Sequence, residues 1–344
     1  MDELTTLPLP SEETVPTAEE MTLGWMEKDL KRVDQEFRNN LRSPVPIIAV
    51  IGEHLLKSGG KRVRAKLLLL SAKLCDYSGE NHISMASLIE FIHTATLLHD
   101  DVVDNAKLRR GVDSANAIWG NEACVLVGDF LFTKCFTRMV ESNNWRILHT
   151  ISKATTIIAE GELEELIRTE KLIRTNDLSL TEEEYLSIIA RKTAYLISAA
   201  TQIGAILANA PKEKEDALAK FGMEVGIAFQ LIDDNLDYTS HESGKDMGMD
   251  LREGKITLPL IFTLKNCDPG EKALIQATVK AQPITERAFL RVLEIIERYR
   301  GVQYTREKAK EYVERAKECL QLFPNSREKE ALCTLADYVL ERKL

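Results

Sequence analysis

The stretch Leu97-Leu98-His99-Asp100-Asp101-Val102-Val103-Asp104 carries three aspartates at the polar end of an apolar helical run, and Phe229-Gln230-Leu231-Ile232-Asp233-Asp234-Asn235-Leu236-Asp237 repeats the pattern. On a helix, the first and last aspartates of each set share a face, and the middle one lies a step of about 100° away. Such hard oxygen ligands suit Mg²⁺, which usually completes its coordination with waters and substrate phosphates. The two sets therefore predict a cation-dependent diphosphate pocket. The six candidate metal ligands are Asp100, Asp101, Asp104, Asp233, Asp234 and Asp237.

A single Asp-Asp-x-x-Asp set could also be a solvated helix face. Here apolar residues lead directly into both sets, so the carboxylates follow buried helix rather than a polar surface stripe. Clustered carboxylates also repel one another unless cations offset their charge. These points favour a metal site over an acidic surface.

The composition predicts a large all-α protein. The chain has 344 residues, of which 44% are hydrophobic and 29% charged, enough to bury a sizeable core. Only ten prolines and 17 glycines occur, and no long alternating apolar and polar pattern is present. We expect one domain over 19–344 after a disordered, acidic tail over 1–18. Helices are expected near 19–41, 46–57, 63–75, 81–105, 113–139, 144–170, 181–208, 213–238, 256–265, 271–280, 286–299, 304–322 and 326–341.

Charge and cysteine usage narrow the class of protein. The net charge is −9 and no basic stripe interleaved with aromatics occurs, so nucleic acid is not expected as a partner. The six cysteines are scattered without metal-ligand spacing, which is typical of reduced thiols in the cytoplasm. No run of 18 apolar residues predicts a transmembrane segment, although peripheral membrane contact during product release is compatible with the sequence.

Basic residues near both motifs could hold phosphates. The segment 58–64, Ser-Gly-Gly-Lys-Arg-Val-Arg, puts cations at the start of an apolar helix, where backbone amides also favour an anion. Arg109 and Arg110 follow the first motif within reach of a bound diphosphate. A Gly-rich charged loop over 244–255 follows the second motif and could close as a lid. Each segment could otherwise be solvated surface or an ordinary connector.

Six segments resemble, in their order along the chain, those of the trans-isoprenyl diphosphate synthases. They are 59–64, 97–111, 161–163, 191–194, 229–237 and 244–259. The run over 92–101 is most similar to the long-chain bacterial enzymes such as octaprenyl diphosphate synthase. The resemblance implies the isoprenoid synthase fold, an antiparallel helical bundle around a large central cavity, usually as a homodimer. It also implies three Mg²⁺ ions, held chiefly by Asp100, Asp104 and Asp233.

The resemblance further implies the role of each remaining site residue. Arg109, Lys192, Lys245 and Lys255 would hold the allylic diphosphate, and Lys61, Arg64, His93 and Arg110 would hold isopentenyl diphosphate. Thr193 and Gln230 would line the reacting carbons. Taken by itself, His93 would more often be a core histidine. The chemistry would be ionisation of the allylic diphosphate, attack by the isopentenyl double bond and loss of a proton, which the departing diphosphate takes in this family.

Two positions depart from the family pattern. Ala65 stands where a proline is frequent, and Glu165 stands where the motif G-E-x-x-Q has an amide. A cyclising terpene synthase would not need the cationic segment 58–64, and a noncatalytic partner subunit would be expected to lack some of the charged residues. A short-chain farnesyl or geranylgeranyl diphosphate synthase remains the nearest alternative.

Product length depends on the first bulky side chain along the channel. Ala95 and Thr96 lie about one helical turn before Asp100 and are small, so the channel is expected to pass them. Phe132, Phe136 and Met139 share one face of the following helix and are candidates for a floor, although each could equally be core packing. We therefore expect a long product, with octaprenyl diphosphate for a quinone side chain the first choice.

Overall fold

The computed structural model describes residues 24–109, 111–175, 177–239, 248–281 and 283–341. The expected tail over 1–18, Arg110 and Lys245 lie outside these ranges. The longer helices are α2 (Glu27–Asn40), α3 (Pro46–Lys57), α4 (Val63–Leu74), α5 (Asn81–Val103), α7 (Asn121–Glu141), α8 (Trp145–Thr175), α9 (Glu182–Ile189), α10 (Tyr195–Leu207), α11 (Lys212–Leu236), α13 (Leu258–Asn266), α14 (Pro269–Lys280), α15 (Glu286–Arg298), α16 (Gly301–Cys319) and α17 (Arg327–Glu341). The shorter elements are η1 (Gly24–Met26), β1 (Leu108–Arg109), β2 (Val112–Asp113), α6 (Ala115–Trp119), the π-helical segment η2 (Ala190–Ala194), α12 (Met249–Arg252) and η3 (Leu320–Leu322).

The helical content confirms the all-α prediction, but two predicted elements are wrong in detail. The single helix expected over 113–139 is interrupted, because Gly120 has a φ of +85° and separates α6 from α7. The small antiparallel hairpin β1–β2, with Arg109 opposite Val112, precedes α6. The helix expected over 181–208 is not α-helical throughout, since residues 190–194 form a π-helical turn, a feature that is frequent at functional sites.

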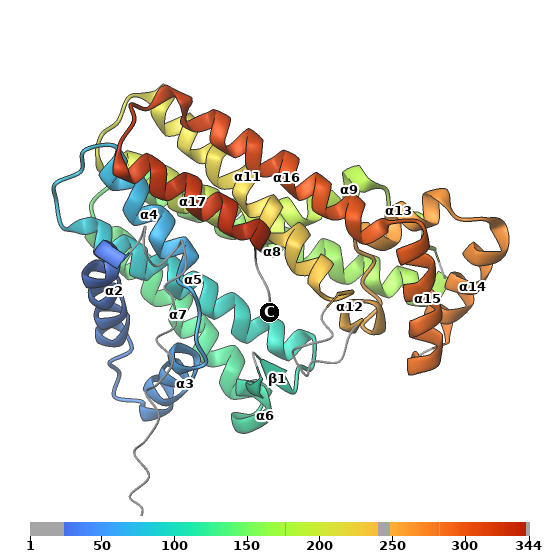
Figure 1. Cartoon of the computed structure of the whole chain (residues 1–344). Coiled ribbons are helices and arrows are strands. Elements are labelled where there is room, and N and C mark those ends of the chain that lie inside the picture. Colours follow the sequence, from blue (N-terminus) through green and yellow to red (C-terminus); the bar gives the residue numbers. More distant parts are fainter. Residues whose placement is uncertain (1–23, 110, 176, 240–247, 282, 342–344) are drawn as a thin grey trace, which may run out of the picture.

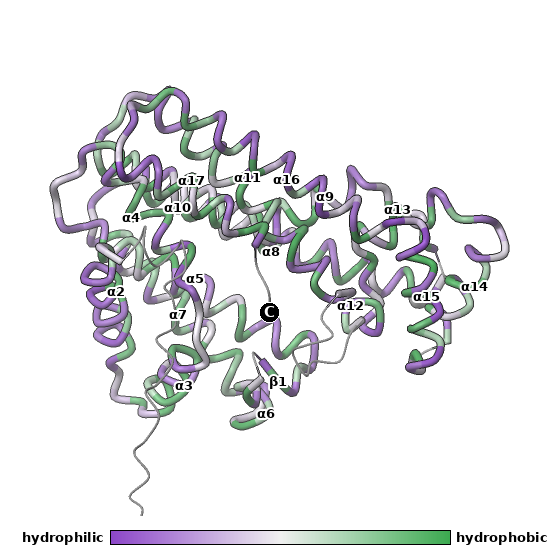
Figure 2. Tube along the Cα trace, in the orientation of Figure 1, coloured by the Kyte–Doolittle hydropathy of each residue, from purple (hydrophilic) through white to green (hydrophobic). Residues whose placement is uncertain are grey.

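The helices pack in long, roughly antiparallel pairs (Figure 1), and α4, α5, α10 and α11 carry the most apolar faces. Helix α7 packs beside α5, and α16 packs beside α11. Hydrophobic segments line the inside of this bundle, while hydrophilic ones dominate the outer helices α2 and α16 (Figure 2). A second apolar cluster, around Phe289 and Ile275, joins α13, α14 and α15, and Ile256 packs against both clusters. No helix within the described ranges is long and apolar enough to cross a membrane.

Two glycines allow α8 and α11 to approach the π-helical segment closely. A Cβ atom on Gly161 of α8 would lie 2.8 Å from Cβ of Arg191 and 3.0 Å from the backbone nitrogen of Lys192. A Cβ atom on Gly226 of α11 would lie 2.5 Å from Cα of Ala194. The distances of 2.8 and 2.5 Å are too short for real Cβ contacts, so these glycines are required for the close packing that brings polar residues of three elements together.

Candidate active site

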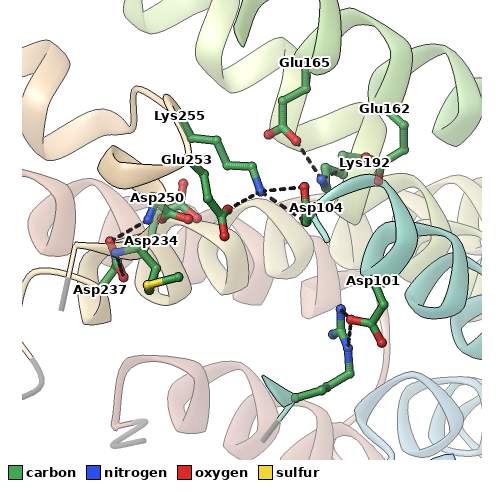
Figure 3. Close-up of polar contacts among 12 residues, drawn as sticks. Asp101, Asp104, Glu162, Glu165, Lys192, Asp234, Asp237, Asp250, Glu253 and Lys255 are labelled. Atoms are coloured by element: carbon green, nitrogen blue, oxygen red, sulfur yellow. Dashed lines mark hydrogen bonds and ion pairs between the residues drawn. The ribbon is translucent and has the colours of Figure 1, made fainter. Parts of the chain in front are cut away.

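The end of α5 is linked to the segment after the second acidic motif by one lysine. Nζ of Lys255 lies 3.3 Å from both carboxylate oxygens of Asp104 and 2.9 Å from Glu253 (Figure 3). Burial alone would lower the pKa of Lys255, but the charges of Asp104, Glu165 and Glu253 raise it. Lys255 therefore stays cationic and joins the two acidic motifs.

A second lysine lies between two carboxylates of α8. Nζ of Lys192 lies 2.8 Å from Glu162 and 2.7 Å from Glu165. The charge of Lys192 also acts on Asp100, which places the lysine beside the first motif. Two of the three lysines expected to hold the allylic diphosphate, Lys192 and Lys255, thus lie among the carboxylates (Figure 3), while Lys245 lies outside the described residues.

The middle aspartate of each motif is buried and already has protein partners. Asp101 accepts from both Nε and Nη2 of Arg109, at 2.7 and 2.6 Å. Asp234 accepts from the buried hydroxyl of Tyr185 and, at 2.6 Å, from Gln230. These two carboxylates therefore orient neighbouring groups.

A short hydrogen-bonded chain connects the π-helical segment with the second motif. Thr193 Oγ1 donates to Gln230 Oε1 at 2.7 Å, which directs the amide nitrogen of Gln230 towards Asp234. The two residues expected to line the reacting carbons are therefore in contact. Their relative position depends on the close approach at Gly226.

The last aspartate of the second motif caps α12. Asp237 accepts from the backbone N–H groups of Met249 and Asp250, at 3.0 and 3.2 Å. Burial, followed by the charges of Asp234 and Asp237, raises the pKa of Asp250 well above its ordinary value. Asp250 therefore adds a further acidic group to the site, and Asp233 lies half-buried on the adjoining turn of α11.

The acidic groups are crowded enough to favour a cation. Burial raises the pKa of Asp100, although Lys192 and Arg109 oppose the shift, and it raises the pKa of Asp234 to about 7. Glu162 shows the same effect, with a pKa of about 7 because of burial. Among the described residues no three ligand side chains converge on one point as a formed metal centre. The cluster nevertheless fits divalent cations, because its own lysines only partly neutralise the carboxylates.

A cavity of about 750 Å³ opens beside these residues, between α8, α9 and the segment around α12. Lys192, Gln230, Asp234 and Lys255 are among the polar residues that line it, and apolar side chains such as Ile188 and Leu172 line it as well. The cavity is therefore large enough and suitably charged for a diphosphate with an apolar substituent.

The cationic segment at the start of α4 is held by α5. Arg62 has a left-handed conformation with a φ of +51° and pairs with Asp34 at 3.0 Å. The backbone N–H of Ala65 donates to the buried carboxylate of Glu90 at 3.1 Å. Proline could not make this bond, so the departure at Ala65 has a structural compensation.

The same contact brings the start of α4 beside the turn of α5 that carries His93, three residues after Glu90. Lys61 lies over the ring of Tyr338 of α17, with Nζ 4.4 Å from the ring centroid. Arg64 and His93 are both half-buried. The described residues that the family resemblance assigns to isopentenyl diphosphate therefore lie just before and at the start of α4 and on α5.

The proposed chain-length residues lie apart from the 750 Å³ cavity. Ala95 is fully buried, and Thr96 donates to the carbonyl of His93 at 2.8 Å. On α7, Phe132 stacks on His99, Met139 is buried and Phe136 is 47% exposed. Within a single chain, Phe132 and Met139 are therefore better candidates than Phe136 for the side chain that closes the product channel.

Several groups in the site were not identified from the sequence. Tyr185, Glu253 and Asp250 all contact or perturb the motif residues. Tyr185 lies seven residues before Lys192, two turns along the same helical run, which is the only local signal that could have indicated it.

Comparisons with known proteins agree with this geometry. The polyprenyl synthetase family model matches residues 45–296. The octaprenyl diphosphate synthase of Escherichia coli (strain K12) is 40% identical over 317 residues, which cover 92% of this chain and 96% of the relative. A polyprenyl synthase from Caulobacter crescentus CB15, crystallised with calcium and isoprenyl diphosphate, is 39% identical with a TM-score of 0.89, over 95% of this chain and 98% of the other. A decaprenyl diphosphate synthase from Rhodobacter capsulatus is 36% identical with a TM-score of 0.88, over 94% and 98% of the two chains.

Proposed function

Because the chain belongs to the polyprenyl synthetase family, we propose that it is a prenyltransferase that extends an allylic diphosphate with isopentenyl diphosphate to a long all-trans polyprenyl diphosphate. The observation that carries the proposal is the pair of lysines held among carboxylates: Lys192 pairs with Glu162 and Glu165 of α8, and Lys255 pairs with Asp104 at the end of α5. The octaprenyl and decaprenyl names of the relatives support a long product, and we propose octaprenyl diphosphate made from farnesyl or a similar primer.

The site residues act by binding and orienting two diphosphates. Lys192 and Lys255 hold the allylic diphosphate, and Thr193 and Gln230 border its reacting end. Asp100, Asp104 and Asp233 would bind Mg²⁺, with three ions proposed, and the metal would supply charge stabilisation to the departing pyrophosphate. Lys61, Arg64 and His93 hold isopentenyl diphosphate with its double bond towards the allylic carbon. The apolar walls exclude water, which would otherwise compete for the allylic cation.

The direct test is incubation with farnesyl and isopentenyl diphosphates. We expect Mg²⁺-dependent release of pyrophosphate and an extractable product of about eight isoprene units. Products of three or four units would favour the short-chain alternative. Absence of turnover by the isolated protein would favour the noncatalytic partner subunit, although the described motif residues are all in place.

Lys61→Ala or Arg64→Ala is expected to raise KM for isopentenyl diphosphate more than KM for the allylic substrate. The reason is that the two diphosphates occupy separate cationic pockets, one at the start of α4 and one at Lys192 and Lys255. Initial rates with each substrate varied in turn measure the difference. An equal rise in both KM values would mean that the segment 58–64 forms no distinct site.

A homodimer is the proposed assembly. Leu126 is 68% exposed and Val140 67% exposed on α7, and Trp145 at the start of α8 is 78% exposed. Exposed apolar side chains along adjacent long helices favour a partner of the same kind. We expect a dimer by analytical ultracentrifugation and a monomer when Leu126 and Val140 are both changed to Asp. A monomeric wild-type protein would contradict the assignment.

We also propose the cytoplasm as the location. Burial raises the pKa of Cys124 to about 11, and that of the buried Cys135 rises as well, so these thiols are unreactive. The six cysteines are all unpaired, which supports a reducing compartment.

A further inference from the structure

Lys192 has two carboxylate partners, and they are not equivalent. Glu162 and Glu165 are three residues apart on α8, and their Oε2 atoms lie 2.8 and 2.7 Å from Nζ of Lys192. With both carboxylates ionised, the single ammonium leaves this cluster a formal charge of −1. Burial of Glu162 raises its pKa to about 7, which reduces the negative charge that Glu162 itself contributes near neutral pH.

The negative charge of Glu165 affects several ionisable residues that line the diphosphate pocket. Burial alone would lower the pKa of Lys192, and the charge of Glu165 is the strongest of those that raise it. The charge of Glu165 also acts on Asp234 and on Lys255, which line the same cavity. Figure 3 shows Glu165 and Lys192 pointing towards each other above the first motif. A diphosphate that binds Lys192 must therefore approach Glu165.

We propose that Glu165 is a positioning residue that restrains Lys192 and weakens the hold of the pocket on diphosphate groups, so that pyrophosphate leaves readily after each condensation. This inference rests on the proposed function. An amide at this position would still donate or accept a hydrogen bond but would add no negative charge, and Lys192 would turn more fully to the ligand. One unit charge about 7 Å from a diphosphate changes binding by roughly ten-fold or more in a partly solvated site.

The experiment compares Glu165→Gln with Glu164→Gln. The two substitutions remove the same charge from neighbouring positions of α8, but Glu164 pairs with Arg168 and Arg191 instead of Lys192. Binding of inorganic pyrophosphate in the presence of Mg²⁺ is measured by calorimetry on the full chain, without turnover. KM values for the allylic and isopentenyl substrates form the second readout.

We expect Glu165→Gln to bind pyrophosphate about ten-fold tighter than wild type and to lower KM for the allylic substrate, with KM for isopentenyl diphosphate unchanged. For Glu164→Gln, the pyrophosphate affinity and KM for the allylic substrate should each stay within about two-fold of the wild-type value. Unchanged or weaker binding by Glu165→Gln would overturn the inference, and weaker binding would indicate that Glu165 itself holds a cation.

Two further results separate the possible failures. If wild type binds no pyrophosphate with Mg²⁺, the proposed function fails rather than the role of Glu165. If Glu165→Gln does not fold, Glu165→Ala removes the same charge, and tighter pyrophosphate binding by that variant supports the inference while unchanged binding overturns it.

Discussion

Asp100→Ala and Asp233→Ala are each expected to lower turnover by several orders of magnitude while the helical fold persists. Each change removes a proposed metal ligand, and the charge of the departing pyrophosphate then lacks stabilisation in the transition state. Neither side chain is part of the apolar core, because both are half-buried at the ends of α5 and α11. Pyrophosphate release at saturating Mg²⁺ and circular dichroism measure activity and fold separately.

The melting temperature provides an independent check on the same variants. Burial raises the pKa of Asp100, so its ionised form at neutral pH opposes folding when no cation is bound. In a chelator, Asp100→Ala should therefore melt at or above the wild-type temperature, and added Mg²⁺ should stabilise it less than wild type. Asp216→Ala, at a carboxylate of α11 that is 60% exposed and pairs with Lys212, serves as the control with wild-type activity. Near-wild-type turnover by Asp100→Ala or Asp233→Ala would refute the metal-site assignment.

The sequence was sufficient to predict the acidic motifs, both lysines and the helical class. The motifs and the helical class depend on local pattern, since each motif ends an apolar helix, whereas the roles of Lys192 and Lys255 were implied by the family resemblance of the segments that carry them. The structure brings Lys255 to Asp104 across 151 residues, which no local pattern could have indicated.

The sequence could not show that the aspartates within one motif have different roles. Asp101 and Asp104 differ only in helical phase, yet Asp101 is fully buried against Arg109 while Asp104 faces Lys255. The difference arises from the hairpin β1–β2, which returns Arg109 onto α5 and is too short to give a strand pattern. Likewise, the close approach at Gly161 and the π-helical turn that presents Lys192 depend on packing between helices.

Ala95→Phe is expected to shorten the product to about the farnesyl or geranylgeranyl level in an enzyme that remains active. Ala95 lies five residues before Asp100, about 7.5 Å from the metal ligands along α5. A phenyl ring at this level would fill the path of the growing chain after the first additions. Chromatography of the extracted products measures their length. An unchanged product distribution would show that the chain does not pass Ala95 and would favour the cavity between α8 and α9 as its path.

The control must separate blocking from overpacking, because Ala95 is fully buried. Ala86 is also fully buried on α5 and lies nine residues earlier, about 180° round the helix at 100° per residue. Ala86→Phe should therefore lower stability without shortening the product.

Phe132→Ala and Phe136→Ala then test which side chain closes the channel. Phe132 is half-buried against His99, whereas Phe136 is 47% exposed in the single chain. We expect Phe132→Ala to lengthen the product. If Phe136→Ala lengthens it instead, the channel must reach the exposed face of α7, where the partner subunit of the proposed dimer would close it.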